Sequence, residues 1–249
     1  MQPELLYLIC TQPRSGSWLL SEALESTNLA GYPQEYYAEV YVEKRVKEWG
    51  VSTPTEYQAK ILETGTTPNG VFGLKFHWYQ FDIFLKQFRE ISGNHDLPAH
   101  RIVASAFPNV RYIRLQRRDT VRQAISYYKA IQTQTWWDID GCVPEENRLA
   151  GQALPFDYDA IARLQKLLLA QEANWRQYFD NAGIVPYTVF FEDFVSRYEE
   201  TVIEVLDYLQ IAHPTPFAIP PPRLKRQADV QTDEWVRLYH QCQQGVTSR

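Results

Sequence analysis

Apolar and polar residues follow a clear order at the start of the chain. Residues 5–10 form an unbroken apolar run, long enough for one buried strand. A short loop of Pro, Arg, Ser and Gly follows, and apolar side chains then return at helical spacing at Trp18, Leu19, Ala23 and Leu24. The pattern predicts a strand, a loop and a helix, in that order.

The same alternation continues along the chain. Further strands are predicted at 71–76, 110–115 and 185–191. Helices are predicted at about 36–65 (with breaks at Gly50 and Pro54), 79–91, 98–106, 121–128, 157–179, 194–209 and 232–242. Strands alternating with helices are typical of an α/β domain with a mainly parallel central sheet flanked by helices. The loops that start at Thr11, Phe76, Gln116 and Glu192 should then share one edge of the sheet, where ligands bind in this class.

Several details sharpen these predictions. Thr53 is a plausible cap for the helix that follows it, and Asn181 and Gly183 should end the helix at 157–179. That helix carries Glu172 on the same side as its apolar residues Ile161, Leu164, Leu168 and Trp175. Residues 132–154 are predicted to be an irregular insertion, 214–222 an extended Pro-rich stretch, and 243–249 a frayed tail.

Composition narrows the function classes. A chain of 249 residues with 45% hydrophobic residues can bury a core, and we expect a single domain over 1–249. A net charge of −5 argues against broad binding to nucleic acid or an anionic membrane, so an anionic ligand must be held by local cations. The many aromatic residues, with 16 Tyr and 7 Trp, should mostly fill the core.

Cysteine usage and the N-terminus point to a compartment. Cys10, Cys142 and Cys242 are far apart and show neither metal spacing nor a disulfide framework, which fits a reducing cytoplasm without a metal site. Residues 1–4 lack the basic region of a signal peptide, and no apolar run reaches the roughly 18 residues of a membrane span. We therefore expect a cytoplasmic protein without an integral membrane segment.

The loop after the first strand has the chemistry of an anion site. Small residues at a helix N-terminus leave backbone N–H groups unpaired at the positive end of the helix dipole. Arg14 adds a guanidinium, and Ser15 and Ser17 add hydroxyl donors. The loop is not a Walker A motif, because it has one Gly and no Lys. A tight turn without a ligand remains the alternative at this stage.

A second strand, polar loop and helix follow at 110–128. Arg118 leaves the end of the strand, and Ser126 lies two turns into the helix. Such a pair can converge on one phosphate through a charge-assisted and a neutral hydrogen bond. Arg117 is the alternative to Arg118, because two adjacent arginines leave the register open by one position.

Five motifs in one order resemble a known family. Residues 13–17 resemble the 5′-phosphosulfate loop of sulfotransferases that use 3′-phosphoadenosine 5′-phosphosulfate (PAPS), and 118–126 resemble their 3′-phosphate signature. Residues 31–35, 67–75, and 226–229 with 233–235 look like the bacterial trehalose 2-sulfotransferase-like branch. The resemblance runs from about residue 5 to 240 and implies a three-layer, P-loop-like fold.

The resemblance implies roles for single residues. Glu35 matches the Glu of the branch's Pro-Gln-Glu motif and is the candidate general base, set among Tyr residues that are expected to raise its pKa. His77 is the rival base. Arg14 and Lys75 are the candidate cations beside the transferred group, although a surface Lys closing a strand is an equal interpretation of Lys75. Arg14 departs from the Lys that many eukaryotic sulfotransferases carry in this loop.

The binding residues follow in the same way. The nucleotide is expected to contact Pro13, Arg14, Ser15, Gly16, Ser17, Trp18, Arg118, Ser126, Arg226 and Gln227, the last two in a closing element at about 223–242. The acceptor is expected to contact Gln34, Glu35, His77, Trp78 and Trp136. Trp136 and its neighbour Trp137 suit either stacking on a sugar or anchoring of the insertion.

The implied function is sulfuryl transfer from PAPS to a hydroxyl of a carbohydrate or glycolipid, with trehalose as the first guess. The product would be adenosine 3′,5′-bisphosphate, no metal is required, and the branch suggests a homodimer. One alternative is a kinase with a degenerate phosphate loop, which would need ATP and Mg²⁺ and which the missing Lys disfavours. Another is a non-catalytic relative that binds the nucleotide or a sugar and transfers nothing.

Overall fold

The structure, a computed structural model, describes residues 3–93, 95–136, 154–223 and 230–247. Its strands are β1 (Leu5–Thr11), β2 (Val71–His77), β3 (Arg111–Gln116) and β4 (Tyr187–Phe190). Its helices are α1 (Ser17–Ser26), α2 (Glu39–Trp49), α3 (Pro54–Gly65), α4 (Trp78–Ser92), α5 (Ala99–Ala106), α6 (Thr120–Thr133), α7 (Tyr158–Ala182), α8 (Phe191–Ser196), α9 (Tyr198–Tyr208) and α10 (Val230–Thr247).

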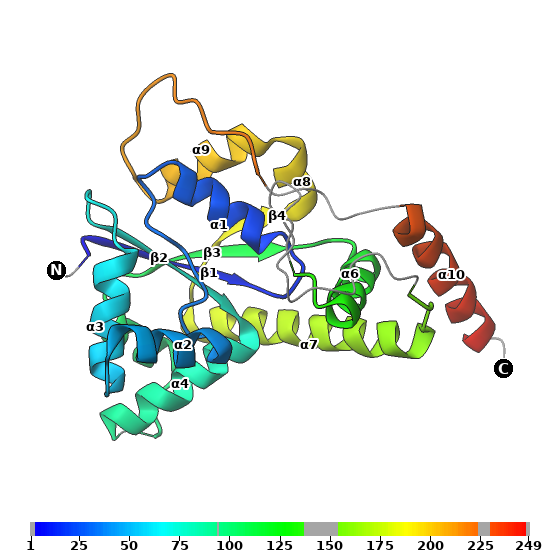
Figure 1. Cartoon of the computed structure of the whole chain (residues 1–249), viewed down its shortest axis with the longest axis horizontal. Helices are drawn as coiled ribbons and strands as arrows, with labels where there is room; N and C mark the ends of the chain where they lie inside the picture. The colour runs from blue at the N-terminus through cyan, green and yellow to red at the C-terminus, as the bar shows by residue number, and fades with distance from the viewer. Residues whose placement is uncertain (1–2, 94, 137–153, 224–229, 248–249) are drawn as a thin grey trace.

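The strands form one parallel sheet in the order β2-β1-β3-β4 (Figure 1). Thr11 lies opposite His77, and Gln116 lies opposite Phe190. The carboxyl ends of all four strands therefore meet at one edge, as the sequence predicts, and the four loops that follow them share it.

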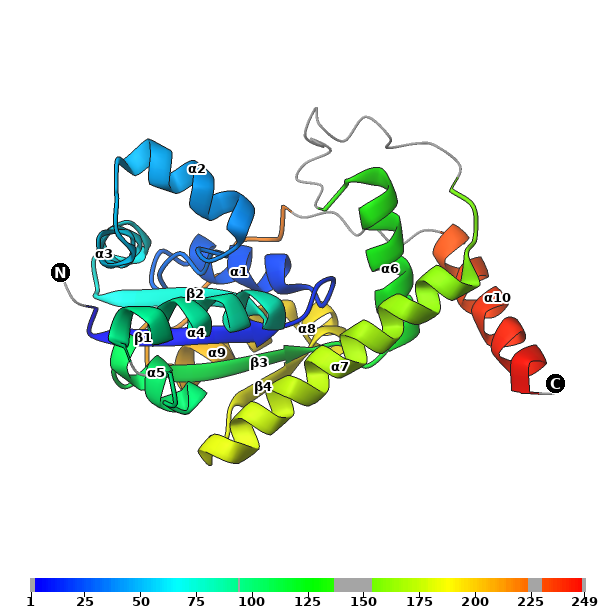
Figure 2. The same ribbon diagram turned by 90° about the horizontal axis from the view of Figure 1, so that it is seen from below.

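Alternate residues of the strands face two helical layers. Leu6, Leu8 and Cys10 of β1 point toward α4, α5 and α7, whereas Tyr7 and Ile9 point toward α1, α8 and α9. Figures 1 and 2 show the two groups of helices on opposite faces of the sheet. The predicted three-layer α/β architecture is confirmed, and the unbroken apolar run of β1 is explained because both of its faces are covered.

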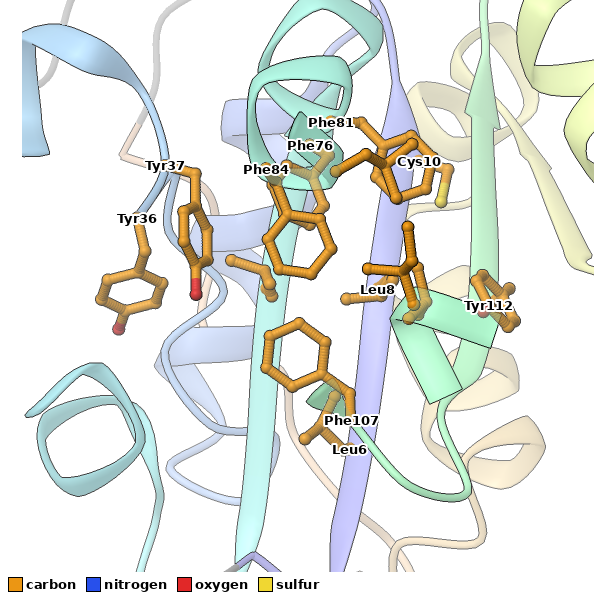
Figure 3. Packing of buried hydrophobic residues seen from close by; sticks show 14 of the residues in the cluster. Leu6, Leu8, Cys10, Tyr36, Tyr37, Phe76, Phe81, Phe84, Phe107 and Tyr112 are labelled. Carbon is orange, nitrogen blue, oxygen red and sulfur yellow. The ribbon is translucent and has the colours of Figure 1, made fainter. Parts of the chain in front are cut away.

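Aromatic side chains fill the layer between the sheet and α4. Phe76 of β2 packs against Phe84 of α4 with ring centroids 5.3 Å apart, and Phe84 stacks on Phe107 at 5.6 Å (Figure 3). All three side chains are fully buried. Because α4 begins directly after β2, this packing also fixes the end of β2, where Lys75 and His77 lie.

A third cluster joins the C-terminal helix to the rest. Trp235 and Tyr239 of α10 are buried against Val121 and Tyr128 of α6 and Ile161 of α7. The Tyr239 hydroxyl donates to Oε1 of Gln165 on α7 at 2.8 Å. The predicted closing element therefore packs against the domain through α10, while its residues 224–229 lie outside the described part of the chain.

Several element boundaries differ from the predictions, and three of the differences have a clear description in the structure. The strand predicted at 185–191 starts only at Tyr187, because Val185 is solvent-exposed and Pro186 has no N–H to donate. The helix predicted at 194–209 is two helices that meet at Arg197, whose φ of −131° is not helical. The predicted frayed tail is wrong as far as Thr247, since α10 continues to that residue. The predicted capping by Thr53 and the stop at Gly183, which has a φ of 62°, are confirmed.

Candidate functional site

Residues 12–16, the predicted phosphate loop, connect β1 to α1. Two of these residues have a left-handed backbone conformation. Arg14 has a φ of 62° and Gly16 a φ of 86°. A Cβ added to Gly16 would lie 2.3 Å from a ring carbon of Phe191, so a larger residue does not fit. The loop turns the N-terminus of α1 to the carboxyl edge of the sheet, where the first N–H groups of the helix have no intrahelical acceptor. This geometry suits a phosphate or sulfate oxygen.

Side chains of β1 and α6, together with a main-chain carbonyl of β3, hold this loop in place. The Thr11 hydroxyl lies 2.5 Å from that of Ser15 and donates to the carbonyl of Leu115 at 2.9 Å. Gln123 of α6 donates from Nε2 to the carbonyl of Pro13 at 2.8 Å. The buried hydroxyl of Ser15 thus holds the loop together. Gln123 was not identified from the sequence, because nothing local marks a helix Gln as a loop partner.

Arg14 joins the phosphate loop to the segment that carries the second phosphate motif. Its Nε donates to Oγ of Ser126 at 3.0 Å, and one of its terminal nitrogens donates to the carbonyl of Trp136. A guanidinium nitrogen of Arg117 donates to the Arg14 carbonyl at 3.1 Å. Burial and the nearby Arg117 lower the pKa of Arg14 to about 10, which leaves its guanidinium charged at neutral pH.

The predicted 3′-phosphate pair makes contacts with other partners. Arg118 forms a two-pronged ion pair with Asp193, at 2.6 and 2.7 Å, and lies 3.9 Å from the centroid of the Phe190 ring. Ser126 accepts from Arg14 instead. The carboxylate of Glu192 accepts from the backbone N–H groups of Arg118 and Asp119 and so fixes the loop after β3.

Glu35 is brought to the end of β2 by a backbone contact. The N–H of Lys75 donates to the carbonyl of Gln34 at 3.1 Å, and Gln34 forms a parallel bridge with Leu74. This pairing places Glu35 Oε1 3.1 Å from Nζ of Lys75. Lys75 is only 1% exposed, which excludes the alternative of a surface Lys closing a strand. Its Nζ also lies 4.4 Å from the ring centroid of Trp18, in the first turn of α1.

Gln80 and His77 complete the surroundings of the carboxylate. Gln80 donates from Nε2 to Glu35 Oε2 at 2.6 Å, while its Oε1 accepts from the His77 N–H at 3.0 Å. The His77 imidazole is buried with Nδ1 3.8 Å from Glu35 Oε2, and neither ring nitrogen has a hydrogen-bond partner among the described residues. An imidazole of this kind can accept a hydrogen bond from a ligand or donate one to it.

The electrostatics of Glu35 correct one expectation. Burial alone would raise the pKa of Glu35, but the charges of Lys75 and His77 and the hydrogen bonds from Gln80 and Lys75 outweigh it and lower the pKa to about 2. The predicted rise caused by neighbouring Tyr residues is therefore wrong. Burial also lowers the pKa of His77, despite the attraction of Glu35. At neutral pH Glu35 is therefore an ionised carboxylate.

The remaining acceptor candidates fall into different environments. Trp78 packs edge-on against Trp175 at 4.9 Å and against the aromatic core, so most of its contacts are structural. The Gln34 amide donates to Glu25 Oε2 at 3.1 Å. Trp136 is 38% exposed and lies 6.1 Å from the Tyr127 ring. Arg226, Gln227 and Trp137 lie outside the described residues.

Tyr79 is a site residue that the sequence analysis missed. Its ring is 46% exposed, and its hydroxyl accepts from the same Gln80 nitrogen that donates to Glu35, at 3.0 Å. A half-exposed ring next to a carboxylate can stack on the apolar face of a sugar. Its position two residues after His77 was the available signal.

No group of three or more His, Cys, Asp or Glu side chains among the described residues is placed to hold a metal ion. None of the helices in this part of the chain combines the length and the apolar character needed to cross a membrane.

Comparison with known proteins places the chain among sulfotransferases. The family model for Stf0 sulphotransferase matches residues 6–242. The chain is 30% identical over 260 residues to trehalose 2-sulfotransferase of Mycolicibacterium smegmatis, covering 94% of this chain and 93% of that protein. It is 31% identical, with the same coverage, to trehalose 2-sulfotransferase of Mycobacterium tuberculosis.

A solved structure with a lower similarity is the sulfotransferase domain from the curacin biosynthetic pathway. It is 14% identical, covers 92% of this chain and 82% of that domain, and aligns with a TM-score of 0.44. The assignment of the fold therefore rests on the parallel sheet and the two helical layers described above.

The low pKa of Glu35 predicts a specific pH dependence of stability. Because the pKa of the carboxyl is lower in the folded chain than its ordinary value of 4.5, its stabilising effect is complete above pH 4.5 and is lost as the pH falls toward 2. Across this pH window we expect the free energy of unfolding to fall by about 3 kcal/mol more in the wild type than in Glu35→Gln. Denaturant unfolding at a series of pH values measures the difference. Exposed Glu43→Gln is the matched control, and parallel curves for wild type and Glu35→Gln would contradict the prediction.

Proposed function

The chain belongs to the Stf0 sulphotransferase family, and from this membership we propose that it transfers a sulfuryl group from PAPS to a hydroxyl of a carbohydrate, with trehalose as the first acceptor to test. The observation that carries the proposal is the buried pair of Glu35 and Lys75 beside the first turn of α1. A carboxylate and a cation next to an anion-binding loop supply what sulfuryl transfer requires: a proton acceptor and charge neutralisation.

Each residue then has one task. The phosphate loop and Arg14 hold the 5′-phosphosulfate, and their positive charge stabilises the leaving phosphate. The acceptor oxygen forms a bond to sulfur as the bond between sulfur and the phosphate oxygen breaks. Glu35 takes the hydroxyl proton, and Lys75 neutralises charge on the transferred group. The products are the sulfate ester and adenosine 3′,5′-bisphosphate.

A low pKa is compatible with the role of Glu35 as base. It keeps the carboxylate ionised at neutral pH, so the group is ready to accept a proton. If the transition state is loose, as in phosphoryl transfer, the hydroxyl proton becomes acidic only as the new bond forms, and a weak base then suffices. Gln80 orients the carboxylate through its 2.6 Å hydrogen bond.

Arg118 is the proposed ligand of the 3′-phosphate. Its partner Asp193 is about half exposed, and exposed ion pairs add little stability, so a phosphate can replace this carboxylate. Arg117, by contrast, already holds the main chain of the phosphate loop at Arg14. Ser126 uses an acceptor lone pair toward Arg14, and its O–H can donate to a phosphate oxygen.

The two competing functions make different predictions. A kinase would require ATP with Mg²⁺, yet the loop has no Lys to contact the phosphates of ATP. A non-catalytic relative would bind adenosine 3′,5′-bisphosphate and transfer nothing. The buried pair of Glu35 and Lys75 favours catalysis over binding alone, because an ion pair of this kind is costly to bury without a use.

Calorimetric titration tests the nucleotide site. We expect the wild type to bind adenosine 3′,5′-bisphosphate about 10–100-fold more tightly than AMP, because charge-assisted contacts with a phosphate contribute about 1.5–3 kcal/mol. Arg118→Ala should abolish this preference. Arg117→Ala should weaken the binding of both nucleotides to the same extent, because it displaces the phosphate loop. Exposed Arg101→Ala is the control. A preference for ATP with Mg²⁺, or a preference lost in Arg117→Ala alone, would contradict the assignment.

Turnover of PAPS and trehalose tests the base. We expect Glu35→Gln to lower kcat by about 10²–10⁴-fold, the usual effect of losing a general base, while adenosine 3′,5′-bisphosphate still binds. His77→Gln should lower kcat by less than about tenfold, since its imidazole then only shapes the site. Product formation is followed by mass spectrometry, with Glu43→Gln as control. The opposite order of the two variants would make His77 the base, and no sulfated product with any sugar would remove the proposed activity.

A further inference from the structure

Glu172 of α7 lies outside the proposed reaction but contacts both phosphate-binding segments. Its Oε2 accepts from Nε2 of Gln12, the first residue of the phosphate loop. Its Oε1 accepts from Nε2 of Gln116, the last residue of β3, and pairs with the guanidinium of Arg114. One carboxylate thus receives donors from the residue after β1 and from the end of β3, where the two loops begin.

The surroundings of this carboxylate make it more than a surface contact. The side chains of Glu172 and Arg114 are 20% and 15% exposed, and Gln12 is buried. A carboxylate removed from water to this extent is costly unless it is paired and hydrogen-bonded. One turn further along α7, the Trp175 indole donates to the carbonyl of Thr11 at 2.9 Å. The middle of α7 is therefore fixed against the end of β1.

Packing alone does not set the spacing of the two loops. A cavity of about 130 Å³ opens beside Glu172, and its lining includes Gln12, Gln116, Thr120 and Gln123. Side-chain hydrogen bonds supplement packing around this incompletely filled space. Arg14, Gln123 and Arg117 already link the two segments. The Glu172 carboxylate adds a link at the points where both loops begin.

We propose that Glu172 is a positioning residue that sets the distance between the 5′-phosphate loop and the 3′-phosphate segment. The inference rests on the proposed function, since it assumes that the two segments bind the two phosphates of one nucleotide. A ligand with both phosphates needs both loops in register, whereas a ligand with one phosphate needs only one loop. Loss of Glu172 should therefore weaken the ligand with two phosphates more than the ligand with one.

The test measures affinity for adenosine 3′,5′-bisphosphate and for AMP in Glu172→Gln. The substitution keeps the side-chain size, but its amide nitrogen would face a donor nitrogen of Gln12, Gln116 or Arg114. We expect affinity for the bisphosphate to fall about tenfold or more and affinity for AMP to fall much less, because small misplacements of binding groups cost up to about 10²-fold. Asp159→Asn, an exposed carboxylate in the first turn of the same helix, should change neither.

Melting temperature and a second variant keep the test decisive. Gln116→Met removes one donor to Glu172 at nearly constant volume. Like Glu172→Gln, it should lower the ratio of bisphosphate affinity to AMP affinity, and it provides the test if Glu172→Gln folds poorly. An unchanged ratio, with or without a lower melting temperature, would reduce Glu172 to a structural role and overturn the inference. A wild type without preference for the bisphosphate would instead overturn the proposed nucleotide site itself, which separates the two failures.

Discussion

The buried ammonium of Lys75 is the constraint on which the site depends. A charge that is 1% exposed must be neutralised within the protein, and the structure does so with the Glu35 carboxylate and the face of the Trp18 ring. These three groups come from three separate parts of the chain. Removing one partner of a buried pair costs about 3–5 kcal/mol, so the ion pair couples stability to the geometry of the site.

Side chains of neighbouring elements also position the two proposed phosphate-binding loops. Thr11, Gln123 and Arg117 donate to main-chain carbonyls and so link the loop after β1 to the end of β3 and the segment that follows it. Glu172 and Trp175 reach the same region from α7. The loops are thus positioned by side chains of neighbouring elements rather than by their own backbone alone, which is how a rigid scaffold can present a short loop accurately.

The fold could be predicted to a large extent because its signals are local. Apolar runs, helical spacing and the Gly183 and Thr53 signals lie within single segments, and alternation of strands with helices sets the parallel sheet. The break at Arg197 and the extension of α10 could not be predicted, because local sequence preferences define helix ends only weakly and tertiary packing decides where a helix stops. Arg117 and Arg118 lie at the carboxyl edge of the sheet, as predicted. Their partners, Arg14 and Asp193, could not be predicted because they are distant in sequence.

The environment of Glu35 shows where prediction from the sequence failed. The neighbours Tyr36 and Tyr37 suggested a raised pKa, yet both are buried in the aromatic core, stacked on Phe72 and Phe76. What decides the pKa is Lys75, and it reaches Glu35 only because β2 pairs with Gln34. Glu172 left a weaker signal, a carboxylate on the apolar side of its helix, which could have indicated a buried partner.

The most direct test of the account is a crystal structure of the protein with adenosine 3′,5′-bisphosphate and trehalose bound. The account predicts the 5′-phosphate at the N-terminus of α1 and the 3′-phosphate on Arg118. It also predicts one sugar hydroxyl within hydrogen-bond distance of the Glu35 carboxylate, at roughly 2.6–3.2 Å. A hydroxyl bound to His77 with Glu35 engaged by Lys75 and Gln80 alone would contradict the assignment of the base. Phosphates bound away from the α1 loop would contradict the account as a whole.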